Sequence, residues 1–379
     1  MPRVLYLQYV NPAYFPPLQQ SSRILANEGW EVRFVGSRAN ADDKMEFPLH
    51  ERVEVLLLPF VPPGIWQKLN YLKFLLWSVW QLFIWRPAWV YVSDVMACPI
   101  GWLLSYWPGV RILYHEHDSP TEPAGNSFQR LTLAARRHLA QQAALCVLPN
   151  ERRVERFLRE TGRRGETLCV WNCPAREEVP AARSVAANDE MIVLYHGTIV
   201  PQRVPRTLLH ALAQSPERVK LRVIGYTTIG APRYVEELQA LAAALGVAER
   251  VEFVGPLSRY ELMERCREAD VGVSVFPMPL DDWNEQTMPG ASCKAFDYLA
   301  CGLPLLVSDL PEWRWMFVEN GYAQACNVND PVSIAAALSW YWENRAEMQA
   351  MGECGRQKIA SEWNYESQFA PVLAALQTL

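Results

Sequence analysis

The stretch KAFDYLACGLPLLVSD, Lys294–Asp309, decides the fold class of this chain. Asp297 opens a short apolar helical segment, which Gly302 and then Pro304 bring to an end. Glycine just past the last helical residue, with proline soon after it, is the expected helix stop signal. The apolar run Leu305–Val307 reads as a buried strand. The stretch therefore predicts a helix that turns directly into a strand of a parallel sheet.

A helix of this kind can hold a nucleotide. Its N-terminus favours phosphate, Lys294 adds a positive charge, and the Asp297 carboxylate can accept two ribose hydroxyl protons. The alternative is an ordinary helix–turn–strand unit of an α/β domain, and the spacing fits both interpretations equally.

Similar units lie on both sides of this stretch. In the second half, the expected strands are MIVLYHG, VKLRVIG, RVEFVGP, DVGVSVF and LPLLVSD. In the first half, they are VLYLQ, EVRFVGS, VEVLLLP, WVYVSD, VRILYHEHD and ALCVLPN. Helical patterns separate several of them, near Gln19–Asn27, Trp66–Arg86, Pro99–Tyr106 and Phe128–Gln142. Fully apolar strands separated by helices predict an α/β protein with parallel sheets covered on both faces.

The alternation stops once, in a polar stretch rich in Ala, Pro and Glu. This break predicts an interdomain linker at 173–190, between a first domain at 1–172 and a second at 191–361. Residues 362–379 form a final helix. Both domains are expected to be doubly wound and Rossmann-like, with ligands bound at the carboxyl ends of the strands.

Composition excludes several other classes of protein. The net charge of −5 gives no electrostatic case for nucleic-acid binding. The nine cysteines are scattered singly without a CxxC pair, which favours a reduced cytoplasmic protein and argues against a zinc site. The N-terminus lacks a signal-peptide pattern, and no run of about 18 uncharged apolar residues predicts a spanning helix.

Lys294–Asp309 resembles the donor-site signature of family-four retaining glycosyltransferases (glycosyl transferases group 1), which have the GT-B fold. That signature runs roughly Ser/Pro-x-Lys-x-x-Glu-Tyr-Met-Ala-x-Gly-Leu-Pro-Val-Val. The matching places are filled by Lys294, Asp297, Tyr298, Ala300, Gly302, Leu303 and Pro304. Asp297 stands for the usual Glu, and Pro289 lies where the family often has another Glu eight positions earlier. The pattern matches a branch of the family that lacks this first Glu.

The resemblance extends over most of the second half, through YHGTIVPQR, VKLRVIG and ERVEFVGPLSRYEL, and more loosely over the first half, through YHEHD and LPNERRVERF. It implies two domains that face a cleft, with the acceptor side in the first domain and the donor site in the second. It also implies that the final helix crosses back to the first domain.

Polar residues cluster at the end of the strand VRILY: His115, Glu116, His117 and Asp118. The resemblance implies that His117 contacts the transferred sugar, and Asp118 would then orient His117 or bind acceptor hydroxyls. A solvated strand end is the alternative. A metal site is disfavoured because no third ligand is placed beside the two histidines.

Transfer from a nucleotide-sugar builds negative charge on the leaving diphosphate, which fixed cations stabilise. The family commonly shows Gly-Arg followed by Lys after the first strand of the second domain. Here Gly197 is kept, Thr198 replaces the Arg, and Arg203 replaces the Lys. Arg203 and Lys294 are therefore the expected diphosphate ligands, because a guanidinium can bind two phosphate oxygens at once.

Glycines at strand ends mark where the backbone can approach a ligand closely. Gly225 and Gly255 lie at such ends, and the resemblance implies that backbone groups near Val254 and Gly255 hold the nucleobase. A turn that can bind the diphosphate precedes Lys294 and consists of Gly290, Ala291 and Ser292.

The helix at 66–85 carries far more aromatic surface than one sheet face needs. Its polar positions Gln67, Asn70, Ser78 and Gln81 fall in a stripe of roughly 80°. One interpretation is shallow insertion at the inner face of a membrane, beside a lipid-linked acceptor. The other is a core helix buried by neighbouring loops.

Together these features predict a retaining glycosyltransferase that uses a nucleoside-diphosphate sugar. The acceptor would be a saccharide or a lipid-linked saccharide, in cell-surface polysaccharide or glycolipid assembly. The resemblance implies no metal or other cofactor, and attack on the face that the leaving group occupies. The alternatives are a nucleotide-sugar epimerase or hydrolase on the same fold, or a catalytically inactive partner that binds sugar nucleotides.

Overall fold

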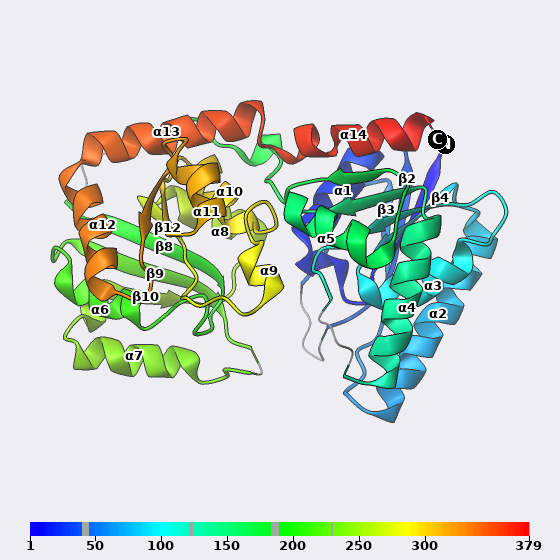
Figure 1. The fold of residues 1–379 in the computed structure, drawn as a ribbon, viewed down its shortest axis with the longest axis horizontal. Coiled ribbons are helices and arrows are strands. Elements are labelled where there is room, and N and C mark those ends of the chain that lie inside the picture. The colour runs from blue at the N-terminus through cyan, green and yellow to red at the C-terminus, as the bar shows by residue number, and fades with distance from the viewer. Residues whose placement is uncertain (40–44, 121–124, 183–188, 229, 379) are drawn as a thin grey trace. The chain divides into compact units, whose positions relative to one another are not determined.

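The computed structural model describes residues 1–39, 45–120, 125–182, 189–228 and 230–378 (Figure 1). The chain forms two compact units, Met1–Asn172 with Tyr365–Leu379, and Cys173–Asn364. Residues 183–188 of the predicted linker lie outside the described residues.

The first unit is built on a parallel seven-stranded sheet of order β3-β2-β1-β4-β5-β6-β7. Its strands are β1 Arg3–Leu7, β2 Glu31–Ser37, β3 Val53–Leu58, β4 Trp89–Ser93, β5 Arg111–His115, β6 Leu145–Leu148 and β7 Thr167–Cys169. Its helices are α1 Pro16–Asn27, α2 Ile65–Trp85, α3 Cys98–Leu104, α4 Ser127–Gln142, α5 Glu151–Thr161 and α14 Tyr365–Thr378. The short helices η1 Pro12–Tyr14 and η2 Val95–Ala97 complete it.

Each face of this sheet has its own core, because successive strand residues point to opposite sides. On one face, Leu5 and Leu7 of β1 pack with residues of α2, α3, α4 and α5. On the other, Val4 and Tyr6 pack with residues of α1 and α14. Figure 1 shows α14, at the C-terminal end of the chain, beside α1.

The second unit has a parallel six-stranded sheet of order β10-β9-β8-β11-β12-β13. Its strands are β8 Met191–Thr198, β9 Val219–Tyr226, β10 Val251–Val254, β11 Val271–Ser274, β12 Leu305–Ser308 and β13 Ala323–Cys326. Its helices are α6 Thr207–Gln214, α7 Tyr234–Ala244, α8 Arg259–Arg267, α9 Trp283–Gln286, α10 Cys293–Ala300, α11 Pro311–Trp313, α12 Pro331–Glu343 and α13 Arg345–Ser361. The short helices are η3 Arg176–Glu178, η4 Ala248–Arg250 and η5 Arg314–Val318.

The predicted α/β class with two doubly wound sheets is confirmed. In both sheets the strand order reverses beside a central strand, β1 in the first unit and β8 in the second. Such switch points are where open α/β sheets bind ligands, beyond the carboxyl ends of the strands.

Local signals and structure agree at three helix ends. Ser258 and Glu261 form a capping box at the start of α8, and the Asp330 side chain caps α12 ahead of Pro331. Helix α10 ends at Ala300 before Gly302, whose φ is 76°. The predicted start of α10 at Asp297 is wrong: the helix begins four residues earlier, at Cys293, so the carboxylate lies inside the helix.

The edge strands β7 and β13 were not among the predicted strands. Both are short, and their sequences TLC and AQAC lack the apolar run that marks the central strands. Among the described residues, no helix has the length and apolarity needed to cross a membrane.

Candidate functional site

Two glycines without side chains lie at the carboxyl end of the central strand β8 and its neighbour β9. Gly197 of β8 pairs in register with Gly225 of β9, and both have positive φ, 118° and 147°. A Cβ at Gly225 would lie 1.8 Å from the Gly197 carbonyl oxygen, so only glycine fits there. A Cβ at Gly197 would lie 2.5 Å from Cε of Lys294. The Lys294 side chain therefore passes over the end of β8 where a side chain is missing.

Lys294 brings its positive charge to this point from the first turn of α10. Its Nζ lies 6.0 Å from the centroid of the Tyr195 ring. Burial, together with the Arg203 guanidinium, lowers the pKa of Lys294 to about 8. The ammonium group is thus charged at neutral pH, although burial and the Arg203 charge both disfavour its charged form. A bound anion would stabilise that form.

Arg203 is the second cation at this end of the sheet. Its guanidinium carbon lies 4.4 Å from the centroid of the Phe276 ring, and Nη2 lies 3.7 Å from Oε1 of Glu285. The aromatic ring holds the planar group through a cation–π contact. Arg203 acts electrostatically on Lys294, so the structure brings together the two cations that were predicted to bind the diphosphate.

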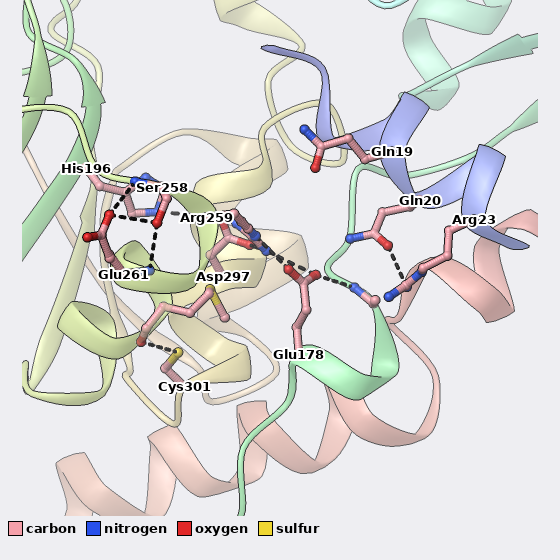
Figure 2. A network of polar contacts seen from close by, with 12 residues as sticks. Gln19, Gln20, Arg23, Glu178, His196, Ser258, Arg259, Glu261, Asp297 and Cys301 are labelled. Carbon is pink, nitrogen blue, oxygen red and sulfur yellow. Dashed lines mark hydrogen bonds and ion pairs between the residues drawn. The ribbon is translucent and has the colours of Figure 1, made fainter. Parts of the chain in front are cut away.

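Asp297 is buried with 1 % of its surface exposed. Both of its carboxylate oxygens accept hydrogen bonds from Arg259, at 2.8 and 2.7 Å (Figure 2). Arg259 also donates to Glu178, at 2.7 and 3.3 Å. His196 Nε2 lies 3.6 Å from Asp297 Oδ2. In this structure a ribose hydroxyl would have to share the carboxylate with Arg259.

Arg259 and Glu178 were missed in the sequence. Glu178 lies in the polar stretch that was assigned to the linker, and Arg259 is the first residue of α8. A cation at a helix N-terminus is electrostatically unfavourable unless an acid compensates it. The position of Arg259 directly after the Ser258 cap therefore indicated, in the sequence, that an acid must lie nearby. Burial opposes its charge, yet Asp297 and Glu178 hold the pKa of Arg259 well above its usual value.

Most of the other predicted donor-site residues lie at the ends of strands or in turns. Val254 ends β10, and no atom lies within 4 Å of where a Cβ at Gly255 would be. Thr198 ends β8, and its carbonyl accepts from the Tyr195 hydroxyl at 2.6 Å. Backbone at the Gly255 end is thus open to approach.

The predicted anion-binding turn before α10 has a positive φ of 81° at Gly290. The N–H groups of Ala291 and Ser292 both donate to the Met288 carbonyl, at 2.9 Å each. These two donors close the turn on itself, so the turn as folded does not direct them to a ligand.

In the first unit, His117 and Asp94 lie together beyond β5 and β4. The Asp94 side chain accepts from the His117 N–H at 3.0 Å, and His117 Nε2 lies 3.1 Å from Ser93 Oγ. Arg153 donates to the His117 carbonyl at 2.5 Å and to Asp118 at 3.1 Å. Burial lowers the pKa of His117 to about 4, so the ring is neutral at pH 7. Its Nδ1 is buried without a protein partner among the described residues.

The His115 ring lies 4.0 Å from the His117 ring between centroids, but the neighbours of His117 have other polar partners. His115 Nδ1 lies 2.5 Å from the Tyr91 hydroxyl, and Glu116 accepts from Arg136 at 2.5 and 2.8 Å. Both side chains are almost fully buried, so the solvated strand end is wrong for them. The Asp118 side chain is 78 % exposed.

Asp94 was not predicted from the sequence. It follows β4 with φ of 62°, a rare conformation for a residue with a side chain. Burial, with Asp118 and Glu116 nearby, raises the pKa of Asp94 to about 7. An acid at the end of the apolar run WVYVS was the available signal. Within the described ranges, no group of three or more His, Cys, Asp or Glu could hold a metal ion.

Comparison with known proteins gives two family matches. Residues 18–173 match the glycosyl transferase 4-like domain, and residues 178–358 match glycosyl transferases group 1. The D-inositol 3-phosphate glycosyltransferase of Geodermatophilus obscurus is 27 % identical over 212 residues, 53 % of this chain and 43 % of that relative. The chain thus spans less than half the length of the curated relatives it matches.

Solved structures share the whole fold at low sequence identity. Sucrose-phosphate synthase from Thermosynechococcus elongatus has a TM-score of 0.72 at 16 % identity, over 100 % of this chain and 98 % of that one. Anabaena HepE in complex with UDP-glucose has a TM-score of 0.70 at 16 % identity, over 100 % of both chains. These likenesses confirm the predicted GT-B fold.

Proposed function

Because the chain belongs to the group 1 glycosyltransferases of the GT-B fold, we propose that it is a retaining, nucleotide-sugar-dependent glycosyltransferase. It moves a sugar from a nucleoside-diphosphate sugar to a saccharide or lipid-linked saccharide acceptor, in the assembly of a cell-surface polysaccharide or glycolipid. HepE, which shares the fold, was solved with UDP-glucose, so a uridine nucleotide is the first donor to test.

One observation carries the proposal. Lys294 and Arg203 hold two positive charges at the carboxyl end of β8, over a strand end where Gly197 leaves the backbone bare. Burial, and then the charge of Arg203, lower the pKa of Lys294, so an anion bound here would stabilise its charged form. A diphosphate has the charge, and its oxygens can accept from both side chains.

In the proposed reaction, the bond between the anomeric carbon and the diphosphate oxygen breaks, and its electron pair goes to that oxygen. An acceptor hydroxyl oxygen bonds to the anomeric carbon on the same face, and its proton passes to the departing phosphate oxygen. Lys294 and Arg203 stabilise the charge that develops on the diphosphate. In this scheme the two side chains do this without a metal or other cofactor.

The remaining residues have binding roles in the proposal. The Asp297 carboxylate accepts hydrogen bonds from the ribose hydroxyls, and Arg259 holds this carboxylate in place. His117 presents a neutral, buried ring to the transferred sugar, and its Nδ1 is available for a hydroxyl. Asp118, with its exposed carboxylate, serves the acceptor.

Lys294 makes the proposal testable by its pH dependence. With a pKa of about 8 in the free protein, Lys294 must take up a proton to bind UDP at higher pH. Titration calorimetry should show constant affinity from pH 7 to 8, and above that a fall of about tenfold per pH unit. Lys294→Arg should keep the affinity and flatten the profile, because arginine stays charged.

Turnover of UDP-sugars gives the matching kinetic test. Lys294→Ala and Arg203→Ala should each lower the rate on the order of 100-fold, as for loss of one transition-state donor. Lys220→Ala, which removes the exposed ion pair between Lys220 of β9 and Glu190 just before β8, is the control and should change neither rate nor affinity. Normal turnover in both alanine variants would place the diphosphate elsewhere. Sugar release to water without any acceptor would instead indicate a hydrolase.

A further inference from the structure

Helix α2 buries three of the four residues of its polar stripe on the side that faces the sheet, beside the apolar side chains of Phe74 and Leu82. Asn70, Ser78 and Gln81 are buried, with exposed fractions of 5, 0 and 5 %. Each has a protein partner: Asn70 donates to Pro59 O and Ser37, Ser78 donates to Phe74 O, and Gln81 accepts from Arg33. A helix that covers a sheet normally buries its apolar side, so the outward side of α2 needs its own explanation.

The outward side of α2 is mostly apolar, with Lys68 and Lys73 as its exposed charged residues. Eight large side chains are 43 to 70 % exposed: Ile65, Trp66, Leu69, Leu72, Leu76, Trp80, Phe83 and Ile84. Exposed apolar residues continue on α3, α4 and the turn between α3 and β5, namely Leu103, Tyr106, Trp107, Phe128 and Leu131. We call these residues together the α2–α4 face.

Ring contacts join these elements into one surface. Phe83 of α2 meets Trp107 edge-on at 4.7 Å between ring centroids, and Tyr71 meets Phe128 of α4 edge-on at 5.2 Å. A contiguous exposed apolar surface of this kind marks an interaction site, whereas single exposed residues do not.

Charge identifies the partner. Helices α2, α3 and α4 contain no Asp or Glu, although the whole chain has a net charge of −5. Within α2 and α4, and directly after α2, the exposed charged side chains that the structure describes are all cations: Lys68, Lys73, Arg86, Arg130 and Arg137. An apolar, aromatic face with a positive border matches a bilayer that carries anionic headgroups.

We propose that the α2–α4 face docks on an anionic phospholipid surface, with α2 in the plane of the interface. Trp66, Trp80 and Tyr106 have the amphipathic rings that favour the headgroup level of a membrane. A second copy of this chain fits less well, because a two-fold contact would bring two positive borders together. The inference concerns attachment only and holds whether or not the proposed reaction is correct.

Vesicle sedimentation of the full chain tests the docking. The protein should sediment with vesicles of phosphatidylcholine and phosphatidylglycerol, far less with phosphatidylcholine alone, and less again as salt screens the charges. Replacing Leu76, Trp80 and Phe83 together by Ser should lower partitioning by roughly 100-fold or more, since three large interfacial side chains are lost. The melting temperature should stay the same, because all three residues are more than half exposed.

The second unit supplies a matched control. Trp315 is 59 % exposed, as is Trp80, so Trp80→Ser and Trp315→Ser remove equally exposed rings. Only Trp80→Ser should weaken vesicle binding. UDP affinity, measured in the same variants, reports on the donor site separately.

Three results would overturn the proposal. One is a wild-type protein that sediments with neither kind of vesicle, and another is a triple variant that still binds at full strength. The third is a dimer in solution that the triple variant dissociates while vesicle binding is absent, which would assign the face to a second copy.

Discussion

At the scale of single residues, the donor site depends on one missing side chain. Lys294 reaches the end of β8 because Gly197 has no Cβ, and the positive φ of Gly197 places that strand end in a backbone conformation that suits glycine. The sequence identified Gly197, Arg203 and Lys294 individually. Their proximity could not be predicted from it, since Lys294 lies 91 positions after Arg203 and 97 after Gly197 along the chain.

Gly197→Ala tests this arrangement. The new methyl group would lie 2.5 Å from Lys294 Cε, so the lysine must move away from the strand end. We expect UDP affinity to fall toward that of Lys294→Ala, and the fall of affinity above pH 8 to be lost.

Gly246→Ala is the control for this change. Gly246 follows α7, has a positive φ of 70° as Gly197 also has a positive φ, and nothing lies within 4 Å of its Cβ position. Equal UDP affinity in the two alanine variants and the wild type would show that the Gly197 gap has no role in holding Lys294.

At the scale of elements, one ion-pair network joins three helices of the second unit. Glu178 of η3 and Asp297 of α10 both bind Arg259 of α8 (Figure 2). Network members separated by 81 and 38 residues cannot be paired from local pattern. Helix boundaries, in contrast, can be predicted from local pattern, because caps and stop signals act within a few residues.

Arg259→Ala should destabilise the second unit by about 3–5 kcal/mol, because it leaves the Asp297 carboxylate buried without its partner. The double variant Arg259→Ala with Asp297→Asn should recover part of this loss, since the uncompensated charge is gone. Urea denaturation measures both. Arg206→Ala, from the exposed pair with Glu237, should cost only about 0–1 kcal/mol. Additive effects of the two substitutions would mean that Arg259 and Asp297 are not coupled.

At the scale of the whole molecule, the C-terminal helix α14 belongs to the unit that contains the N-terminus. Tyr365, Phe369, Val372 and Leu376 are buried in the core that α1 and one face of the first sheet form. Each unit has a separate hydrophobic core, so we expect two unfolding transitions in calorimetry.

Phe369→Ala should lower the free energy of unfolding of the first unit by about 3–5 kcal/mol, the usual loss for a buried phenylalanine. The unfolding transition of the second unit should not change. Gln377→Ala, at an exposed position of the same helix, should change neither transition. UDP binding in the second unit should persist in both variants. A shift confined to the second transition would contradict the assignment of α14 to the first core.

The sequence by itself determined the α/β class, the doubly wound pattern, the starts of α8 and α12 and the end of α10, because periodicity, caps and breakers act over a few neighbouring residues. It also marked Lys294 and Arg203 as candidates. Only the tertiary structure decided that Asp297 lies against Arg259, that His115 and Glu116 are buried, and that α2 buries Asn70, Ser78 and Gln81 of its polar stripe. Those outcomes depend on which distant groups meet in the core. A buried polar atom is stable only where a partner from elsewhere in the chain satisfies it.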